Sequence, residues 1–528
     1  MTFVRDEKLR VLLIKPYQPV TLQVTSPPLG ILYLASTLRQ RFGSRVDVRA
    51  EDHWLDRRRY RDMEKDLAEF RPHVVGISAL NFEAEESGRI AHLVRRILPD
   101  TKIAIGGPFA HGATNLEKIV NTGLYDGVFD GEADWSFPIT VERWFSGNQK
   151  LDDIVGLTWR DGDRYVTNGC SSPIDGKQMV GVVGDLDDIP FPAWDLVDFD
   201  AYSKRINNNG NMRGKRYAPI FTSRGCPFLC TYCHDIFGKK FHGRSPENVL
   251  AEVKLLGEQY GVDELQIVDD IFNMNSRRMK TICRGLAEHG MYICFPNGLR
   301  GDILDEEGVQ ALVDAGMYEV AVAIETVTPR LQDMIKKRLR LTELLKAIDW
   351  MSERGVMVKG FFMIGFPTET LEEMQRTIEF AVKSKLTHAV FNLVTPQPGT
   401  PIYDDAYREN AEALHKVVLH DYFAATCWYA EAYGQDMHKI RGRAYFRFYL
   451  SSPRRIGRLL RYMSAKDLFR GFYYWARKVF VRNYADKGLD DALPDALKSL
   501  RKTVPDRRED HALGIESRLT VLQEDSLS

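Results

Sequence analysis

The sequence predicts an α/β protein in three parts: an N-terminal doubly wound parallel sheet, a central partial (β/α)6 barrel, and a C-terminal α-helical region. Two long stretches alternate short apolar runs with helix-like segments, the pattern of parallel strands covered by helices. Beyond about residue 404 the strand-like runs disappear. The 528 residues are also too many for one ordinary hydrophobic core, which favours several domains.

The first domain is expected at residues 1–145. Its strands are predicted at 10–14, 46–50, 74–78, 102–105 and 127–129, and its helices at 28–41, 60–69, 83–98 and 116–121. Ligands of such sheets bind at the carboxyl ends of the strands. The candidate binding loops are therefore 15–27, 51–55, 78–83, 106–111 and 130–134. Gly106 and Gly107 permit close approach of a flat ligand, although a plain turn explains them equally well.

Residues 146–216 are expected to form a linker, because the periodic pattern fades into two short strands near 156–159 and 165–167. Its segment 187–194 combines prolines with aromatic residues. Prolines stiffen a linker and aromatic side chains anchor it, so this segment is a candidate brace between two domains.

The partial barrel is expected at residues 217–404. Its six strands begin near residues 217, 264, 292, 319, 357 and 388, and each of the first five precedes a helix-like segment. In barrels of this kind the chemistry lies at the carboxyl ends of the strands. The loop after the first strand is the main candidate for a reactive site, because three of the seven cysteines lie within it.

These cysteines, Cys226, Cys230 and Cys233, are spaced as Cys-x3-Cys-x2-Cys. Three soft thiolates suit an iron-sulfur cluster, and a set of only three ligands leaves one metal position open for a reactant. A structural zinc site completed by His234 or His242 is the alternative. A disulfide is less favoured, because closely spaced cysteines in a chain without a secretion signal indicate metal or redox chemistry.

The cysteine loop resembles that of the radical S-adenosylmethionine (SAM) enzymes, whose pattern is Cys-x3-Cys-x-aromatic-Cys, with Tyr232 in the aromatic place. The resemblance implies that the three cysteines hold a 4Fe-4S cluster and that SAM binds its fourth iron. Reductive cleavage of SAM would then give a 5'-deoxyadenosyl radical. The resemblance also implies an electron donor such as flavodoxin or ferredoxin.

Later strand ends extend the same resemblance over roughly 190 residues. It implies that an acidic side chain of Asp269-Asp270 meets the SAM ammonium group, although helix capping by Asp270 is an alternative. It places Glu325 on the SAM ribose hydroxyls. It also implies that Gly365 lies beside the adenine, and Arg300 is a further candidate for cofactor binding at the end of the third strand.

The first domain resembles the cobalamin-binding domain of the cobalamin-dependent radical SAM family. The resemblance rests on segment 78–80, with Ser78 and Leu80, on Gly106-Gly107, and on segment 126–132, which ends at Glu132. The Asp-x-His-x-x-Gly motif, which supplies a histidine to cobalt in some cobalamin proteins, is absent from the first strand-to-helix loop. His53 is expected to be a surface or packing residue, and the lower face of cobalt to lack a histidine ligand.

The resemblance favours an enzyme that methylates an unactivated carbon of a small or lipid-like substrate, with cobalamin as the methyl donor. A radical SAM cyclase or carbon-carbon coupling enzyme is the alternative within the family. A zinc-stabilised protein that binds membrane or RNA is the alternative from another class. The sequence assigns no residue of the chain to catalysis.

The composition predicts a cytoplasmic protein, because the charged N-terminus does not read as a signal and no apolar run is long enough to span a membrane. With a net charge of −1, nucleic acid is an unlikely partner. Residues 405–528 are expected to be helical with a polar tail. Segment 439–482 carries thirteen basic residues and one acidic residue among many aromatic ones, which suits either membrane contact or a helical cap on the barrel.

Overall fold

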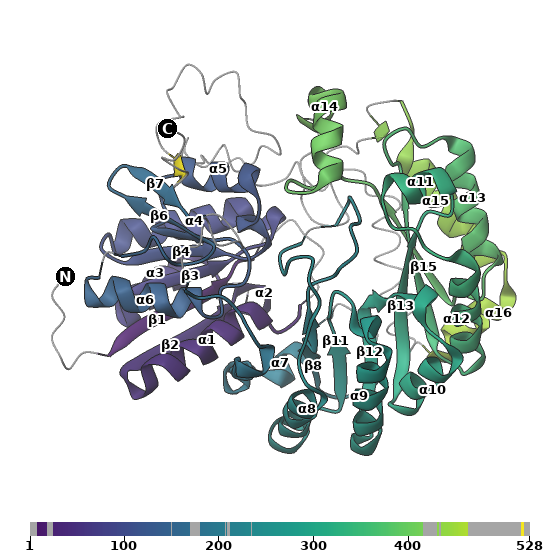
Figure 1. Cartoon of the computed structure of the whole chain (residues 1–528), viewed down its shortest axis with the longest axis horizontal. Helices are drawn as coiled ribbons and strands as arrows, with labels where there is room; N and C mark the ends of the chain where they lie inside the picture. The colour runs from purple at the N-terminus through teal and green to yellow at the C-terminus, as the bar shows by residue number, and fades with distance from the viewer. Residues whose placement is uncertain are drawn as a thin grey trace, which may run out of the picture.

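The computed structural model contains two sheets, each covered by helices, that lie side by side (Figure 1). This arrangement confirms the predicted α/β class. The structure describes residues 8–17, 25–56, 58–148, 150–168, 180–205, 207, 212–233, 235–415, 430–431, 434–462 and 519–521.

Five parallel strands form the centre of the first sheet, in the order β2-β1-β3-β4-β5. Every apolar residue of β1 and β3 is buried, as expected for parallel strands covered on both faces. The strand order reverses between β1 and β3, which makes the edge above them the expected ligand site. The bounds are β1 (Leu9–Lys15), β2 (Val46–Asp52), β3 (Val74–Ser78), β4 (Lys102–Gly106) and β5 (Gly127–Phe129).

Helices cover both faces of this sheet. One apolar cluster joins the strands to α1 and α6, and a second joins them to α3, α4 and α5. The helices are α1 (Leu29–Phe42), α3 (Tyr60–Phe70), α4 (Ala84–Ile97), α5 (Ala113–Asn121) and α6 (Ser136–Ser146). The short helix α2 (His53–Asp56) begins at His53, which is buried beside Glu51 and is therefore a packing residue.

The short strands expected in the linker are present, but they extend the first sheet. β6 (Leu157–Asp161) pairs antiparallel with β5, and β7 (Arg164–Thr167) pairs antiparallel with β6. β16 (Leu519–Val521) adds a further strand beside β7. The first sheet is therefore mixed at this edge, where the sequence pattern predicted parallel strands alone.

The expected brace is formed by the segment around Trp194. Its backbone contacts the first domain through the Ala193 amide, which donates to the Leu32 carbonyl at 3.1 Å. The buried Trp194 indole donates to Glu252 of the barrel helix α8 at 2.9 Å. One short segment thus ties α1 to the barrel.

The second sheet has six parallel strands, in the order β15-β14-β13-β12-β11-β8. Consecutive strands are parallel neighbours joined through helices, as expected for the predicted partial barrel. The strands are β8 (Tyr217–Ile220), β11 (Glu264–Ile267), β12 (Tyr292–Leu299), β13 (Met317–Glu325), β14 (Met357–Ile364) and β15 (His388–Leu393). The helices are α8 (Pro246–Tyr260), α9 (Ser276–His289), α10 (Glu306–Asp314), α11 (Pro329–Met334), α12 (Leu341–Glu353), α13 (Leu371–Lys383) and α14 (Pro401–His415).

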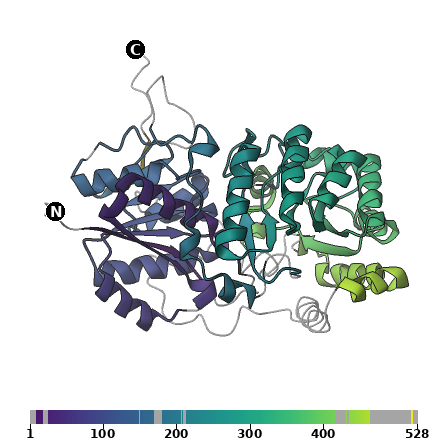
Figure 2. The ribbon, with the colours of Figure 1, turned by 90° about the horizontal axis from the view of Figure 1, so that it is seen from below.

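Two further helices, α15 (Met437–Leu450) and α16 (Pro453–Tyr462), lie at the barrel edge farthest from the first sheet (Figure 2). Phe448 is fully buried, and the Tyr445 hydroxyl accepts a hydrogen bond from the Phe391 amide of β15 at 3.2 Å. The described half of segment 439–482 therefore caps the barrel, and residues 463–482 lie outside the described residues. No helix among the described residues is long and apolar enough to cross a membrane.

Candidate active site

The three cysteines lie on one loop after β8. The loop is closed at its base by β9 (Ser223–Arg224) and β10 (His242–Gly243), which pair antiparallel. The Cys226 amide donates to the Gly238 carbonyl at 3.4 Å, and the Cys233 amide donates to the Cys230 carbonyl at 3.3 Å. Cys226 and Cys230 are half-buried and Cys233 is exposed.

Gly225 allows the loop to fold back on itself. Its φ is 78°, in the left-handed region that favours glycine. A Cβ atom at this position would lie 2.1 Å from the Lys240 carbonyl oxygen and 2.9 Å from that of Phe237. The segment that leads into β10 therefore packs directly on the backbone just before Cys226.

Two acidic residues after β11 hold the base of the loop. Asp269 is buried and accepts hydrogen bonds from the Thr222 amide, the Thr222 hydroxyl and the Ser223 hydroxyl, each at 2.6 Å. Burial raises the pKa of its carboxyl. Asp270 accepts from the Gly225 amide at 3.1 Å, and α9 is capped by Asn275 instead. Both carboxylates thus contact the cysteine loop itself.

The donor set fits an iron-sulfur cluster. Three thiols on one braced loop suit a four-iron cluster with one iron left for another ligand. Within the described ranges, no three His, Cys, Asp or Glu side chains lie close enough to bind one metal ion together. His234, one candidate for a zinc site, lies outside the described residues, and His242 belongs to β10.

A second polar group lies where β13 ends. The Tyr232 hydroxyl donates to Glu325 Oε1 at 3.1 Å, and Lys337 Nζ contacts Glu325 Oε1 at 3.0 Å and the Tyr232 hydroxyl at 2.7 Å. Glu325 and Lys337 are both buried. Burial, followed by the charge of Glu325, raises the pKa of Tyr232 well above its usual value. The structure thus joins two residues expected to bind cofactor, and it adds Lys337, which the sequence did not indicate.

The backbone at Glu325 is irregular. Ala323 pairs with Phe361 and Glu325 pairs with Phe362, so Ile324 is an extra residue in β13. Bulges of this kind redirect side chains and are common beside active sites. Glu325 also has a φ of 64°, a conformation that non-glycine residues adopt mainly where the surrounding structure enforces it.

Arg300 contacts the cysteine loop from the end of β12. Its guanidinium carbon lies 3.6 Å from the centre of the Phe228 ring, and its Nε donates to the buried Asp302 at 3.0 Å. Gly365 follows β14 with a φ of 89°, and its amide donates to Glu369 Oε2 at 2.6 Å. Arg300 and Gly365 therefore lie at the same end of the barrel as the cysteines.

The predicted cobalamin loops meet at the carboxyl edge of the first sheet. Ser78 ends β3 and pairs with Gly106 of β4. Gly107 has a φ of 82°, and a Cβ atom there would lie 2.9 Å from the Ala79 carbonyl oxygen. The Leu80 amide donates to Glu83 at 2.7 Å. The glycine pair therefore lets the loops after β3 and β4 touch through their backbones.

Glu132 faces the barrel. Its carboxylate accepts a hydrogen bond from Arg224 Nη1 at 2.8 Å, and the same guanidinium donates to Asp134 at 2.7 Å. Arg224 and Asp134 are buried, so these ion pairs lie inside the interface between the two domains. Glu132 was expected to contact cofactor, and the structure shows it holding the strand that enters the cysteine loop.

His111 makes a second bridge between the domains. Its Nδ1 lies 2.7 Å from Asp130 of the first domain, and its Nε2 lies 3.0 Å from Asp235 of the cysteine loop. The hydrogen bond to Asp130, together with Asp235, raises the pKa of His111. Asn81 donates to Gln397 at 3.3 Å nearby. The carboxyl ends of the two sheets are therefore joined at several points.

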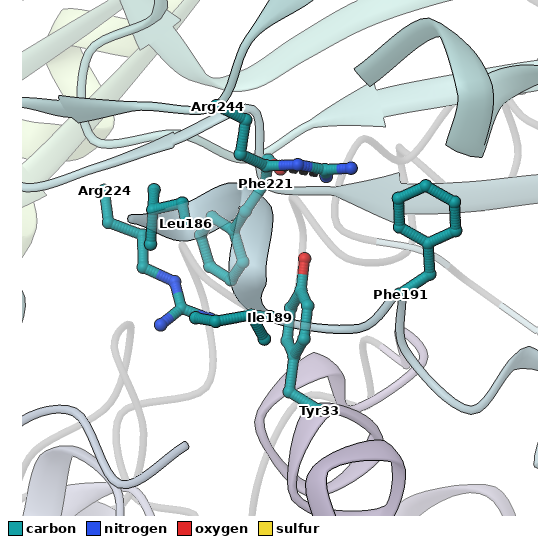
Figure 3. A pocket seen from close by; sticks show the side chains of 7 residues that line it. All are labelled: Tyr33, Leu186, Ile189, Phe191, Phe221, Arg224 and Arg244. Atoms are coloured by element: carbon teal, nitrogen blue, oxygen red, sulfur yellow. Dashed lines mark hydrogen bonds between the residues drawn. The ribbon is translucent and has the colours of Figure 1, made fainter. Parts of the chain in front are cut away.

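A small pocket lies behind the cysteine loop, between the domains. Tyr33 rises from α1 and points its hydroxyl toward the Arg244 side of the pocket (Figure 3). The remaining lining comes from the linker and from the base of the cysteine loop: Leu186, Ile189, Phe191, Phe221 and Arg224. Because Arg224 and Arg244 are both buried in ion pairs, the pocket is part of the domain interface.

Two family models match the chain. Residues 220–381 match the Radical SAM superfamily, and this range contains the cysteine loop and most of the second sheet. Residues 20–134 match the B12 binding domain, and this range contains β2, β3, β4 and β5 of the first sheet. The two matches follow the two sheets of the structure.

Two curated relatives align with most of the chain. Cytidylyl-2-hydroxyethylphosphonate methyltransferase from Streptomyces wedmorensis is 31% identical over 420 residues, which cover 72% of this chain and 78% of the relative. Anaerobic magnesium-protoporphyrin IX monomethyl ester cyclase from Rubrivivax gelatinosus is 23% identical over 407 residues, which cover 75% of this chain and 70% of the relative.

The fold is also shared with a solved structure, the radical S-adenosylmethionine methyltransferase TsrM from Kitasatospora setae, which contains cobalamin and a [4Fe-4S] cluster. The TM-score is 0.62 at 18% identity, over 76% of this chain and 75% of that chain. Taken together with the matched domains, these similarities show that the chain belongs to the cobalamin-dependent radical SAM methyltransferase family, as an enzyme whose cofactors are a 4Fe-4S cluster, SAM and cobalamin.

Proposed function

We propose that this enzyme transfers a methyl group to an unactivated carbon of a small or lipid-like molecule. The observation that carries the proposal is the meeting of the two sheets at their carboxyl ends. A Cβ atom on Gly112, in the loop after β4, would lie 3.2 Å from the Gly399 Cα atom, in the loop after β15. The two cofactor domains therefore present their ligand-binding edges to one another.

Specific residues have distinct roles in this proposal. Cys226, Cys230 and Cys233 bind the cluster, and Glu325 accepts hydrogen bonds from the ribose hydroxyls of SAM. The loops that carry Ser78, Leu80, Gly106 and Gly107 contact cobalamin. When bound, the cluster and SAM supply a carbon-centred radical, and cobalamin supplies the methyl group.

We assign four further candidates for cofactor binding, Asp269, Asp270, Arg300 and Glu132, to positioning the cysteine loop. Asp269 and Asp270 hold the base of the cysteine loop through Thr222, Ser223 and Gly225. Arg300 packs on Phe228 of the same loop. In the proposed arrangement, Asp269, Asp270 and Arg300 hold the cysteine loop and so fix the positions of its three thiols. Glu132 of the first domain holds the same loop through its ion pair with Arg224.

Ring formation without methyl transfer is the second candidate, favoured by the similarity to the cyclase from Rubrivivax gelatinosus. The mass of the product separates the two reactions. A methylated product is heavier than the substrate by one methyl group in place of one hydrogen, whereas ring closure removes two hydrogens.

Two partners belong to the proposal. Reductive cleavage of SAM requires an electron from outside the chain, and we assign its delivery to a small redox protein such as flavodoxin or ferredoxin.

Peripheral contact with a membrane through segment 439–482 is supported by Phe446 and Leu450, which are exposed beside the exposed basic residues Arg443 and Arg447.

A cysteine substitution tests the radical chemistry. In anaerobically reconstituted protein, we expect about four irons per chain and release of 5'-deoxyadenosine from SAM under reduction. Cys230→Ala removes a thiolate ligand, so it should lose iron and abolish cleavage. Cys283→Ala is the matched control, because Cys283 is buried in α9, away from the loop. Cleavage retained by Cys230→Ala, or a wild-type protein loaded with zinc and free of iron, would contradict the proposal.

A further inference from the structure

Lys337 stands out because it is a buried lysine beside the cysteine loop that no motif explains. Its Nζ contacts Glu325 Oε1 at 3.0 Å and the Tyr232 hydroxyl at 2.7 Å, and the side chains of Lys337 and Glu325 are 9% and 7% exposed. A buried cation is costly unless it is paired and hydrogen-bonded. Here it is paired with the carboxylate at the end of β13.

Both hydrogen bonds to Glu325 reach the same oxygen. Oε1 accepts from Tyr232 at 3.1 Å and from Lys337, whereas Oε2 has no hydrogen-bond partner in the part of the chain that the structure describes. A carboxylate has two oxygens and about four lone-pair sites. Glu325 is therefore fixed by one oxygen, and the other is available to accept from a ligand.

The turn that carries Lys337 is built to hold it in place. Lys336 and Arg338, on either side of it, have φ values of 53° and 50°, and both are exposed. Such left-handed conformations are strained in non-glycine residues and persist only where other contacts enforce them.

Gln332 supplies those contacts and links the turn to β13. Its carbonyl oxygen accepts from the Lys337 amide at 3.1 Å, and its side chain accepts from the Leu339 amide at 3.2 Å. The same side chain donates to the Ile324 carbonyl at 3.1 Å, directly before Glu325. The Arg300 guanidinium adds a bond to the Lys337 carbonyl at 2.9 Å. The distance between Lys337 and Glu325 is thus set by the backbone on both sides.

We propose that Lys337, together with Tyr232, is a positioning residue that locks Glu325 by Oε1 and so presents Oε2 to the ribose hydroxyls of SAM. This inference rests on the proposed role of Glu325. Lys337 contacts no reacting atom. It holds the carboxylate in one orientation before SAM arrives, so the hydrogen bonds to the ribose form without reorientation.

The test combines a variant with an altered ligand. Equilibrium dialysis of the reconstituted holoprotein would compare SAM with its 2'-deoxy analogue, in the wild type, in Lys337→Gln and in Lys336→Gln. The Lys336→Gln control removes an exposed charge one residue away. We expect the wild type and Lys336→Gln to bind SAM about tenfold more tightly than the analogue, the effect of one good charge-assisted hydrogen bond. Lys337→Gln should lose this preference.

The outcomes separate the inference from the function on which it rests. A wild type that binds neither ligand would refute the proposed function. If the wild type prefers SAM and Lys337→Gln weakens both ligands equally while keeping that preference, Lys337 has only a structural role and the inference is wrong. Unchanged binding in Lys337→Gln overturns it as well. Iron content measured on each variant confirms that the cysteine loop is intact in every comparison.

Discussion

At the carboxyl end of the barrel, the carboxyl group of Glu369 has a raised pKa. Its Oε2 accepts from the amides of Gly365 and Phe366 at 2.6 and 3.0 Å. Its Oε1 is buried without a partner among the described residues. Burial raises the pKa of Glu369 to about 7, although the two hydrogen bonds from backbone amides act to lower it. The turn that contains Gly365 is thus held by a carboxyl that is protonated below neutral pH.

The raised pKa predicts a specific pH dependence of stability. Below about pH 4.5, Glu369 is protonated in both the folded and the unfolded chain. As the pH rises toward 7 only the unfolded chain releases the proton, so the free energy of unfolding falls. Between about pH 4.5 and pH 7, the free energy of unfolding of the wild type should therefore fall by about 3 kcal/mol relative to that of Glu369→Gln. Urea denaturation of both proteins between pH 5 and pH 8 measures most of the difference.

Glu373, four residues later, is the matched control. The hydrogen bond from Arg330 lowers its pKa to about 2. Its contribution to stability is therefore complete above about pH 4.5 and lost only as the pH falls toward 2. The curve of Glu373→Gln should run nearly parallel to that of the wild type from pH 5 to pH 8, because burial raises the pKa of Glu369 more than the charge of Glu373 does. A Glu369→Gln curve that also runs parallel would show that Glu369 is ionised throughout.

At the scale of single residues, the sequence predicted the cluster ligands but not the residues that support them. Cysteine spacing is a local pattern, so the sequence alone is enough to propose Cys226, Cys230 and Cys233 as ligands. The contacts of Asp269 with Thr222 and Ser223 depend on the pairing of β8 with β11, which spacing along the chain does not contain. Lys337 was missed because a run of basic residues normally indicates a solvated turn.

Among the elements, the parallel strands were the most predictable part. β3 and β5 have the predicted bounds, since buried apolar runs between polar loops define such strands well. Helix α6 was missed because Pro138 and several β-branched residues near its start weaken the helical signal. β6 and β7 were assigned to a linker because an antiparallel edge gives only short, weak patterns.

The cysteine loop depends on one glycine, which a pair of substitutions can show. Gly225 and Gly238 both have positive φ, at 78° and 72°. Only at Gly225 would a Cβ atom strike the backbone, whereas the space around Gly238 is open to 4 Å. Gly225→Ala should therefore displace the segment at Lys240 and reduce bound iron severalfold. Gly238→Ala should cost only about 1 kcal/mol in stability and keep its iron. Equal iron content in the two variants would disprove this account of the loop.

On the scale of the whole molecule, the two sheets face each other through residues far apart in the sequence. His111 contacts Asp235, which lies 124 residues later in the chain. Arg224 contacts Glu132 and Asp134, which lie 92 and 90 residues earlier. The order of domains was predictable from their separate patterns. Their contact surface was not, because it is formed by side chains from strand-end loops, which carry no periodic signal. These bridges hold the loops predicted to bind cobalamin against the cysteine loop.

In the proposed function, both cofactor domains of this chain act in a single reaction. This function predicts that reconstituted, cobalamin-loaded protein incubated under reduction with SAM bearing a deuterated methyl group releases 5'-deoxyadenosine. The corrinoid extracted afterwards should carry the deuterated methyl group, as mass spectrometry can measure. Cleavage of SAM with an unlabelled corrinoid, or protein that binds no corrinoid at all, would contradict the claim.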